Sequence, residues 1–325
     1  MLVDSCLNPE TREPAALSYL NSIGVRPCDS VCLVLVTHWD DDHTQGIARV
    51  VEQCDHATVA CSLALNRTDI VQFVIEQRRA QGGLGSGLDE LRTILGQCRS
   101  TGRLVWAKAT LPLHPRAAGG NSTMTALSPS DDAVSRSIES LIERASGKQV
   151  AFSLRYRAPE GPNGSCVAAT VRAGETSILL GADLVNAANI QTGWDAVLAH
   201  ARPDTSASVV KVPHHGSEGA HHADVWEEIV DDDAVAIVTP WVVAGGHLPT
   251  AEDLARLRGV AQRVYLTAMP TLGRVKKDSA VEKLITKVAG IRVEELRGWG
   301  QVRARRRPDE TSWRVDLDGD ARAIA

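Results

Sequence analysis

The sequence contains no apolar run of the roughly 20 residues that are needed to cross a bilayer. Residues 1–4 carry no basic segment and no hydrophobic stretch follows them, so no signal peptide is expected. The cysteines form no C-x-x-C pair, and Cys32, Cys61 and Cys166 lie in apolar, strand-like runs where reduced core thiols are expected. These absences predict a cytoplasmic protein with no membrane association.

The sequence also has no excess of basic residues: it contains 35 Lys and Arg and 40 Asp and Glu, which give a net charge of −5. A protein with this charge does not hold nucleic acid through its overall field, so phosphate contacts would come from local basic groups or metal ions. The densest basic run is Arg303, Arg305, Arg306 and Arg307, in an alternating segment before Pro308. A solvated hairpin edge is the preferred interpretation of that run, with a substrate patch as the alternative.

Fixed-period repeats and long low-complexity tracts are absent too. The glycine-rich segment 81–87 lacks the spacing of a phosphate-binding loop. At 325 residues the chain can bury a full core. We predict an α/β fold with mixed sheets, formed as a single domain over residues 1–325. The domain would have two similar halves with a soft boundary at 159–164.

Hydrophobic periodicity predicts strands and helices along the whole chain. Strands are expected at 31–37, 57–62, 103–109, 124–127, 150–156, 166–171, 177–180, 208–212, 235–239, 263–267, 300–305 and 312–315. Helices are expected at 15–23, 45–54, 68–79, 89–98, 131–145, 223–230, 251–260 and 280–288. Ser130 is the expected cap of the helix at 131–145, and Thr250 with Asp253 forms a capping box for the helix at 251–260.

Residues 37–46, Thr-His-Trp-Asp-Asp-Asp-His-Thr-Gln-Gly, follow a buried strand and hold two histidines and three carboxylates. His38 and Asp40 share one face of the chain, and the following turn aims Asp42 and His43 at a second point. This pattern suits two cations about 3.5–4 Å apart, as in two-metal hydrolases. The alternative is a loop that caps a helix through Asp42, but capping requires one acid and no histidine.

Further candidate ligands also follow predicted strands. Asp183 ends the run 178–182 and could bridge two metals through its two oxygens. His214 and His215 precede Gly-Ser, so that one could bind metal while the other faces substrate as an acid or hydrogen-bond donor. His247 stands behind two glycines at another strand end. We interpret the remaining histidines as surface or structural groups: His56, His114, His200, His221 and His222.

In this order the motifs resemble those of the metallo-β-lactamase-fold hydrolases, and most closely the ComEC-like branch, named for the hydrolase domain of competence DNA-uptake membrane proteins. The likeness rests on residues 37–43, 163–166, 179–183, 212–217 and 246–249. The first and fourth segments are specific, and the others support them through their order. The resemblance implies an αβ/βα four-layer sandwich with metals in a groove at the sheet edges.

The resemblance also implies a set of metal ligands: His38, Asp40, Asp42, His43, Asp183, His214 and His247. In that set His38 and Asp40 serve one ion, Asp42 and His43 serve the other, and Asp183 bridges them. Asp4 would support the site from an early strand.

The sequence departs from the family pattern in several places. Asp40 replaces the second histidine of the wider superfamily, as is usual in this branch, and Gly-Ala-Asp replaces Thr-Gly-Asp. No convincing histidine between His56 and Gly164 fills the ligand slot that many relatives use. The hairpin that precedes the Asp4 strand in this branch is missing, so that sheet edge would be exposed, covered by a protein partner, or an artefact of the choice of start site. The transmembrane parts are also missing, so DNA transport is not implied.

The leading hypothesis is a dinuclear metal-dependent phosphodiesterase or nuclease that uses Zn²⁺, with Mn²⁺ as the alternative. Two cations would activate a water, which Asp42 or Asp183 could orient, and His215 could donate a proton or a hydrogen bond to the substrate. Lys211 and Ser217 are candidate substrate contacts, although Lys211 could equally be structural. The alternatives are a hydrolase of a lactone, thioester or other small ester, and a non-catalytic sensor or scaffold.

Overall fold

The computed structural model describes residues 1–66, 86–113, 122–145, 161–243, 246–269, 298–307 and 309–324. The helices expected at 68–79 and 280–288 and the strand expected at 150–156 lie outside the described residues. The soft boundary at 159–164 lies partly outside them, and its described part belongs to the 3₁₀ helix η2 (Gly161–Ser165). The described residues form a mixed α/β structure, as predicted.

One sheet contains parallel strands from the N-terminal part of the chain. Its order is β1 (Leu2–Val3), β2 (Leu33–Val36), β3 (Thr58–Ser62) and β4 (Leu104–Ala107). The helices in this part are α1 (Ala15–Ser22), α2 (Pro27–Ser30), α3 (Asp41–Thr44), α4 (Ile47–Gln53) and α6 (Ser86–Ser100). Strand β1 forms one edge of this sheet, at the position expected to be exposed or covered by a partner. A protein partner on that edge stays a prediction.

The other large sheet is mixed and contains seven strands, which extend from β15 at one edge to β5 at the other. In spatial order they are β15 (Arg322–Ile324), β12 (Arg263–Leu266), β9 (Val230–Val238), β8 (Ala207–Lys211), β7 (Thr176–Leu180), β6 (Ala169–Ala173) and β5 (Ser122–Ala126). The accompanying helices are α7 (Asp131–Ala145), α8 (Gly193–His200), α9 (Ala223–Glu228) and α10 (Ala251–Val260). Because β7, β8 and β9 are parallel neighbours, their carboxyl ends meet at one edge of the sheet.

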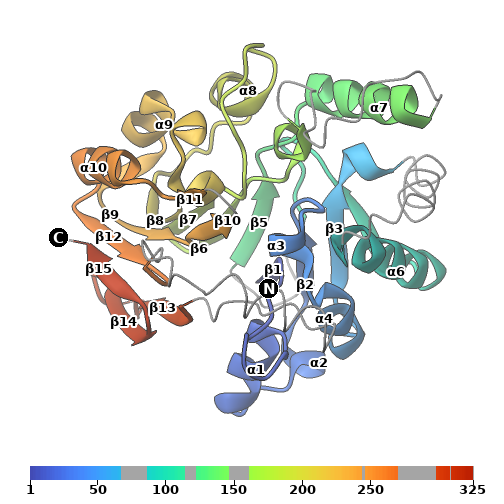
Figure 1. Cartoon of the computed structure of the whole chain (residues 1–325), viewed down its shortest axis with the longest axis horizontal. Coiled ribbons are helices and arrows are strands. Elements are labelled where there is room, and N and C mark those ends of the chain that lie inside the picture. The colour runs from blue at the N-terminus through green and yellow to red at the C-terminus, as the bar shows by residue number, and fades with distance from the viewer. Residues whose placement is uncertain are drawn as a thin grey trace, which may run out of the picture.

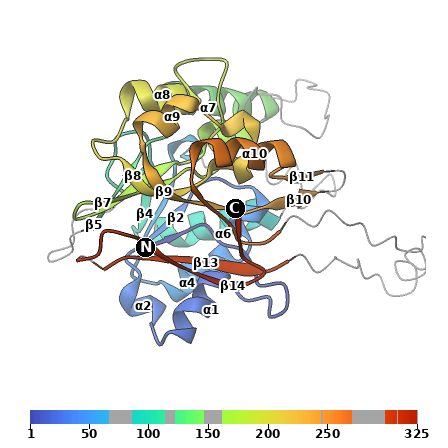
Figure 2. The same cartoon turned by 90° about the vertical axis from the view of Figure 1, so that its left-hand side faces the viewer.

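Buried side chains connect these elements into packed layers. Leu33 and Leu35 of β2 share a cluster with Met124 of β5, whereas Val34 and Val36 point the other way and share a cluster with α1, α4 and α6. The two-residue alternation of a strand therefore lets β2 contribute to both clusters. A third cluster lies between the seven-stranded sheet and α8, α9 and α10. Figure 2 shows α8, α9 and α10 above the strands and α1, α2 and α4 below them. Figure 1 shows α6 beside β3.

Two predictions about single segments are confirmed by the structure. The basic run lies in an antiparallel hairpin of β13 (Gly300–Arg305) and β14 (Arg314–Gly319), where Arg305 and Arg307 are exposed and Arg303 and Arg306 are partly buried. The Ser130 hydroxyl accepts the Ala133 N–H at 3.2 Å, and Thr250 forms the complete capping box with Asp253. A further hairpin, β10 (Trp241–Val243) with β11 (Gly246–Leu248), was not expected.

Other predictions about single segments were wrong. Cys32 was expected in the core, but it is exposed because it precedes β2, whereas Cys61 and Cys166 are buried. The strand expected to begin at Cys166 begins at Ala169, because the Val167 N–H donates to the Thr37 carbonyl at 3.0 Å. Among the described helices, none has both the length and the apolarity that a membrane crossing requires.

Candidate metal centre

Candidate ligands leave the carboxyl ends of β2, β7 and β8 and converge. His38 to His43 follow β2, Asp183 follows β7, and His215 lies in the 3₁₀ turn η3 (Pro213–Gly216) after β8. The approach of β7 to β8 needs a small residue, because a Cβ on Gly181 would lie 2.9 Å from the Lys211 carbonyl oxygen and 2.9 Å from the Cβ of Pro213. Glycine at position 181 therefore serves the contact between two strands.

Left-handed backbone conformations occur around this convergence. Asp4, Ala182, His214 and His215 have φ values of 56°, 46°, 44° and 54°, which non-glycine residues adopt rarely. Each costs on the order of 1–3 kcal/mol, and such strain concentrates at functional sites. The His214 N–H donates to the Ala182 carbonyl at 3.0 Å, so the turn after β8 is tied to the turn after β7. This tie places His215 beside Asp183.

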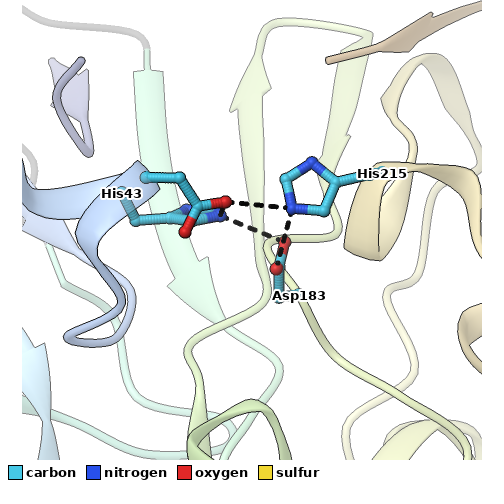
Figure 3. Close-up of side chains that lie close together, drawn as sticks. His43, Asp183 and His215 are labelled. Carbon is cyan, nitrogen blue, oxygen red and sulfur yellow. Dashed lines mark ion pairs between the residues drawn. The ribbon is translucent and has the colours of Figure 1, made fainter. Parts of the chain in front are cut away.

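Asp42, His43, Asp183 and His215 offer ligand atoms that all lie within 4.8 Å of one another. His43 Nε2 lies 3.2 Å from Asp183 Oδ1, and His215 Nε2 lies 3.3 Å from Asp183 Oδ2 and 3.1 Å from Asp42 Oδ2. Figure 3 shows the rings of His43 and His215 pointing toward the carboxylate of Asp183 from opposite sides. One carboxylate therefore turns a different oxygen to each ring.

His38 extends the cluster through Asp183. Its Nε2 lies 4.0 Å from Asp183 Oδ2 and 3.7 Å from Asp40 Oδ2. The rings of His38 and His43 have centroids 4.3 Å apart. The predicted residues His38, Asp40, Asp42, His43 and Asp183 thus form two overlapping groups that share Asp183.

The tautomer of His43 follows from the group that its Nδ1 contacts. Nδ1 lies 2.7 Å from Asp4 Oδ2, and a carboxylate oxygen can only accept a hydrogen bond. The proton of a neutral His43 therefore resides on Nδ1. Its Nε2 then presents a lone pair to Asp183.

The same reasoning applies to His215 and His38. His215 Nδ1 donates to the Thr239 carbonyl at 2.8 Å. The Thr37 hydroxyl donates to Asp4 Oδ2 at 2.8 Å, so its oxygen accepts the Nδ1–H of His38 at 2.9 Å. Each ring is held by a hydrogen bond on Nδ1, as the histidines of metal sites commonly are.

Three imidazole lone pairs therefore face carboxylate oxygens, and this contact is repulsive unless a proton or a cation lies between them. Among the described residues, the buried Nε2 of His38 has no hydrogen-bond partner. Leaving buried polar atoms unpaired costs about 1–3 kcal/mol each. Imidazole nitrogens and carboxylate oxygens are common ligands of Zn²⁺, so the residues present fit a divalent cation.

The ionisation of the histidines reflects the same crowding. Burial, together with the charge of His43, lowers the pKa of His38 to about 4, so His38 is neutral at pH 7. Burial opposes the charged form of His43 as well, but Asp183 and Asp4 raise its pKa well above 6.5. For His215, hydrogen bonds to Asp183 and Asp42 outweigh burial and raise the pKa. A proton thus occupies the places in front of His43 and His215 that a cation would take.

The acids differ among themselves. Burial raises the pKa of Asp40 to about 6, with a further contribution from the charges of Asp42 and Asp183. Burial would also raise the pKa of Asp183, but the positive charge of His43 and hydrogen bonds from both imidazoles hold it well below 3.8. Asp183 is therefore the carboxylate most firmly kept ionised, which suits a bridging ligand.

Two other predicted ligands lie elsewhere. His214 Nε2 lies 3.2 Å from the Asn163 amide nitrogen and its Nδ1 lies 2.9 Å from the Ser217 hydroxyl, so both ring nitrogens are engaged. His215, and not His214, aims its Nε2 at the carboxylates of Asp42 and Asp183. His247 pairs with Val242 in the β10–β11 hairpin, and no hydrogen bond or ion pair within the described part of the chain joins it to the cluster.

The predicted substrate contacts have protein partners. The Lys211 ammonium donates to the Val212 carbonyl at 3.0 Å, and burial lowers its pKa. The Ser217 hydroxyl is bound to His214. These two side chains are used within the protein, and the structure does not place them on a free surface.

Some supporting residues were not predicted. Thr37 and the Thr239 carbonyl fix ring tautomers, and Trp241 stacks on His215 with ring centroids 5.8 Å apart and an interplanar angle of 16°. A contact to a main-chain carbonyl cannot be predicted from residue type, because every residue has that carbonyl. Thr37 was visible only as the residue beside His38.

A comparison with protein-family models finds no match to this chain. A comparison with curated proteins finds no match either.

Proposed function

We propose that the chain is a dinuclear metal-dependent hydrolase of phosphodiesters, with nucleic acid or nucleotides as substrates. The observation that carries this proposal is the buried, unpaired Nε2 of His38 facing the same carboxylate as His43 and His215. A structural core gains nothing from burying His38 Nε2 beside this acid, because the contact costs desolvation without a hydrogen bond in return.

The residues separate into two ligand groups. His38, Asp40 and Asp183 would hold one ion. Asp42, His43, His215 and Asp183 would hold the second. The three imidazoles favour Zn²⁺, and the three carboxylates make Mn²⁺ the alternative. Two divalent cations held in these groups would lower the pKa of a bound water to near neutrality and neutralise charge on phosphoryl oxygens.

The role of the chain's own residues is to fix this centre before substrate arrives. Asp4 accepts hydrogen bonds from His43 Nδ1, the Thr37 N–H and the Thr37 hydroxyl at 2.7, 2.8 and 2.8 Å. Through Thr37 it also sets the tautomer of His38. One carboxylate behind the centre thus orients two rings in front of it, which reduces the reorganisation needed during reaction.

The fold and the motifs support the same proposal. The packing of helices on two sheets supports the proposal of an αβ/βα four-layer sandwich of the metallo-β-lactamase type. In that fold, metals lie at the edge where strands of both sheets end. The ligands here follow β2 of one sheet and β7 and β8 of the other, consistent with the ComEC-like motif order.

A substrate panel tests the reaction class. The metal-reconstituted protein is assayed against bis-p-nitrophenyl phosphate, single- and double-stranded DNA and RNA, a lactone and a thioester. We expect turnover of the phosphodiesters and about 100- to 1,000-fold lower rates for Asp183→Asn, on the order of what removing one group that stabilises transition-state charge costs. Turnover of the lactone or thioester alone would refute the phosphodiesterase assignment and favour small esters.

A matched control separates the centre from general effects of charge removal. Asp195 contacts His222 Nε2 at 3.3 Å, so it forms an aspartate–histidine pair outside the cluster. Asp195→Asn is expected to retain activity within about threefold. Equal loss of activity in Asp195→Asn and Asp183→Asn would show that the assay reports folding and not the centre.

A further inference from the structure

Asp41 is the one acid of the His38–His43 segment that has no place in either ligand group. Its side chain leaves the cluster, and its Oδ1 accepts the backbone N–H of Gly87 at 2.7 Å. Gly87 lies in the first turn of α6, where backbone N–H groups lack partners within the helix. Asp41 therefore caps a helix that is 46 residues away in sequence.

In a second contact the roles are exchanged, because α6 supplies the carboxylate and the start of α4 supplies the backbone N–H groups. Glu90 of α6 accepts the Gly46 N–H on Oε1 at 3.2 Å and the Ala48 N–H on Oε2 at 2.8 Å. Gly46 is the N-cap residue of α4, and no side chain of its own segment caps that helix. Each side thus supplies a carboxylate to the helix start of the other.

Between these two sets of hydrogen bonds, the backbone of α6 at Gly87 lies directly against residues 39–44. A Cβ on Gly87 would lie 2.4 Å from the Trp39 carbonyl oxygen, 2.5 Å from Thr44 Oγ1 and 2.9 Å from Asp41 Oδ1. All three atoms belong to residues 37–46, the segment that carries the candidate ligands His38 to His43. Only glycine allows α6 to approach this closely.

We propose that Asp41, Gly87 and Glu90 form a reciprocal clamp that positions Asp42 and His43 for metal binding. This inference rests on the proposed metal centre. On its other side the segment is held by the N-terminal strand region, where the Ser5 N–H donates to the His43 carbonyl at 2.8 Å and Asp4 binds the His43 ring. The clamp supports the same segment from the side opposite to this strand region. Asp42 and His43, next to Asp41 in the single turn of α3, then cannot rotate away from Asp183.

The test compares metal affinities of folded proteins by competition with a chromophoric chelator. Asp41→Ala removes the acceptor of the Gly87 N–H, whereas Asp41→Asn retains an oxygen at that place. We expect Zn²⁺ to bind Asp41→Ala 10- to 100-fold more weakly than wild type, the usual effect of losing a support of a metal ligand. Asp41→Asn should remain within about threefold of wild type. The Co²⁺-substituted proteins should show the same order in their d–d absorption spectra.

Ser130→Ala is the control, because Ser130 caps α7 by the same kind of bond, accepting the Ala133 N–H at 3.2 Å. It should lower the unfolding midpoint and leave Zn²⁺ affinity unchanged. Gly87→Ala is an independent variant that keeps both carboxylates. It should weaken Zn²⁺ binding at least 10-fold with an unchanged far-ultraviolet circular dichroism spectrum, and it decides the question if Asp41→Ala does not fold.

The outcomes separate this inference from the proposed function. If wild type binds Zn²⁺ and both Asp41→Ala and Gly87→Ala bind it equally well, the clamp does not position the ligands. Equal weakening in Ser130→Ala would also overturn the inference, because loss of stability alone would then explain the effect. If the wild type itself binds no metal, the proposed centre fails first, and the inference fails with it.

Discussion

The histidines of this centre are set by what lies behind them. Asp4 and Thr37 hold two rings, and the Thr239 carbonyl holds a third. The motif in residues 37–43 was sufficient to single out His38 and His43 as candidate ligands, because metal-binding side chains were crowded after a buried strand. Spacing could not choose between His214 and His215. The choice follows from left-handed backbone conformations at both residues, which sequence patterns do not reveal.

Asp4→Asn tests the support behind the rings. An amide has one acceptor oxygen, so it cannot serve both His43 Nδ1 and the two Thr37 donors. We expect 10- to 100-fold weaker Zn²⁺ binding, measured by chelator competition. The control is Asp195→Asn, which alters an aspartate–histidine pair outside the cluster. This variant should bind Zn²⁺ as tightly as wild type does. An affinity within twofold of wild type for Asp4→Asn would show that the rings are oriented without it.

Metal affinity should depend on pH through His43 and His215. Their pKa values are raised in the metal-free protein, so both are increasingly protonated as pH falls, and a cation must displace those protons. Affinity for Zn²⁺ is therefore expected to rise with pH above 6.5, with protons released on binding. Titration calorimetry in buffers of different ionisation enthalpy measures this release. A pH-independent affinity without proton release would contradict the assigned ligands.

Secondary structure elements differ in how well their sequences predict them. Helix α7 begins at Asp131, as its serine cap and acidic first turn predict, and helix α10 (Ala251–Val260) begins and ends where its cap and periodicity predict. Helix α8 was not predicted, because in Gly193–His200 the residues Trp194, Ala196 and Val197 are all buried and leave little polar periodicity. The first residues of β9 were missed because Asp231, Asp232 and Asp233 hide its strand pattern.

Thr250→Ala tests the energy of one element boundary. The Thr250 hydroxyl accepts the Asp253 N–H at 3.1 Å, and Asp253 accepts the Thr250 N–H at 2.8 Å. Losing the hydroxyl leaves a helix-start N–H without its partner, so we expect about 1 kcal/mol less stability. Urea denaturation at pH 7 measures the difference. A change below about 0.3 kcal/mol would indicate that Asp253 alone maintains the helix start.

At the scale of the whole molecule, the centre joins two sheets. The ligands after β2 come from the parallel sheet, and Asp183 and His215 come from the seven-stranded sheet. The sequence predicted the α/β class and the strand ends, because each ligand group follows an apolar run. It could not predict which strand ends meet, because the contact of β2 with β5 and β6 depends on packing between residues far apart in sequence.

A cation between the sheets should therefore stabilise the whole fold. Binding to the native state alone adds about 2.7 kcal/mol when free metal is 100 times its dissociation constant. We expect chelation to lower the thermal unfolding midpoint by several degrees in wild type, measured by differential scanning calorimetry. In Asp183→Asn the chelator should change the midpoint much less. Equal shifts in both proteins would place the stabilising metal elsewhere.

The metal content of the purified protein tests the central claim most directly. After reconstitution with Zn²⁺ or Mn²⁺ and removal of excess metal, elemental analysis of wild type should give two ions per chain. Asp183→Asn should lose at least one of them while remaining folded. Fewer than one equivalent in folded wild-type protein with either metal would contradict the account, because the strand ends that meet around Asp183 would then not form a metal centre.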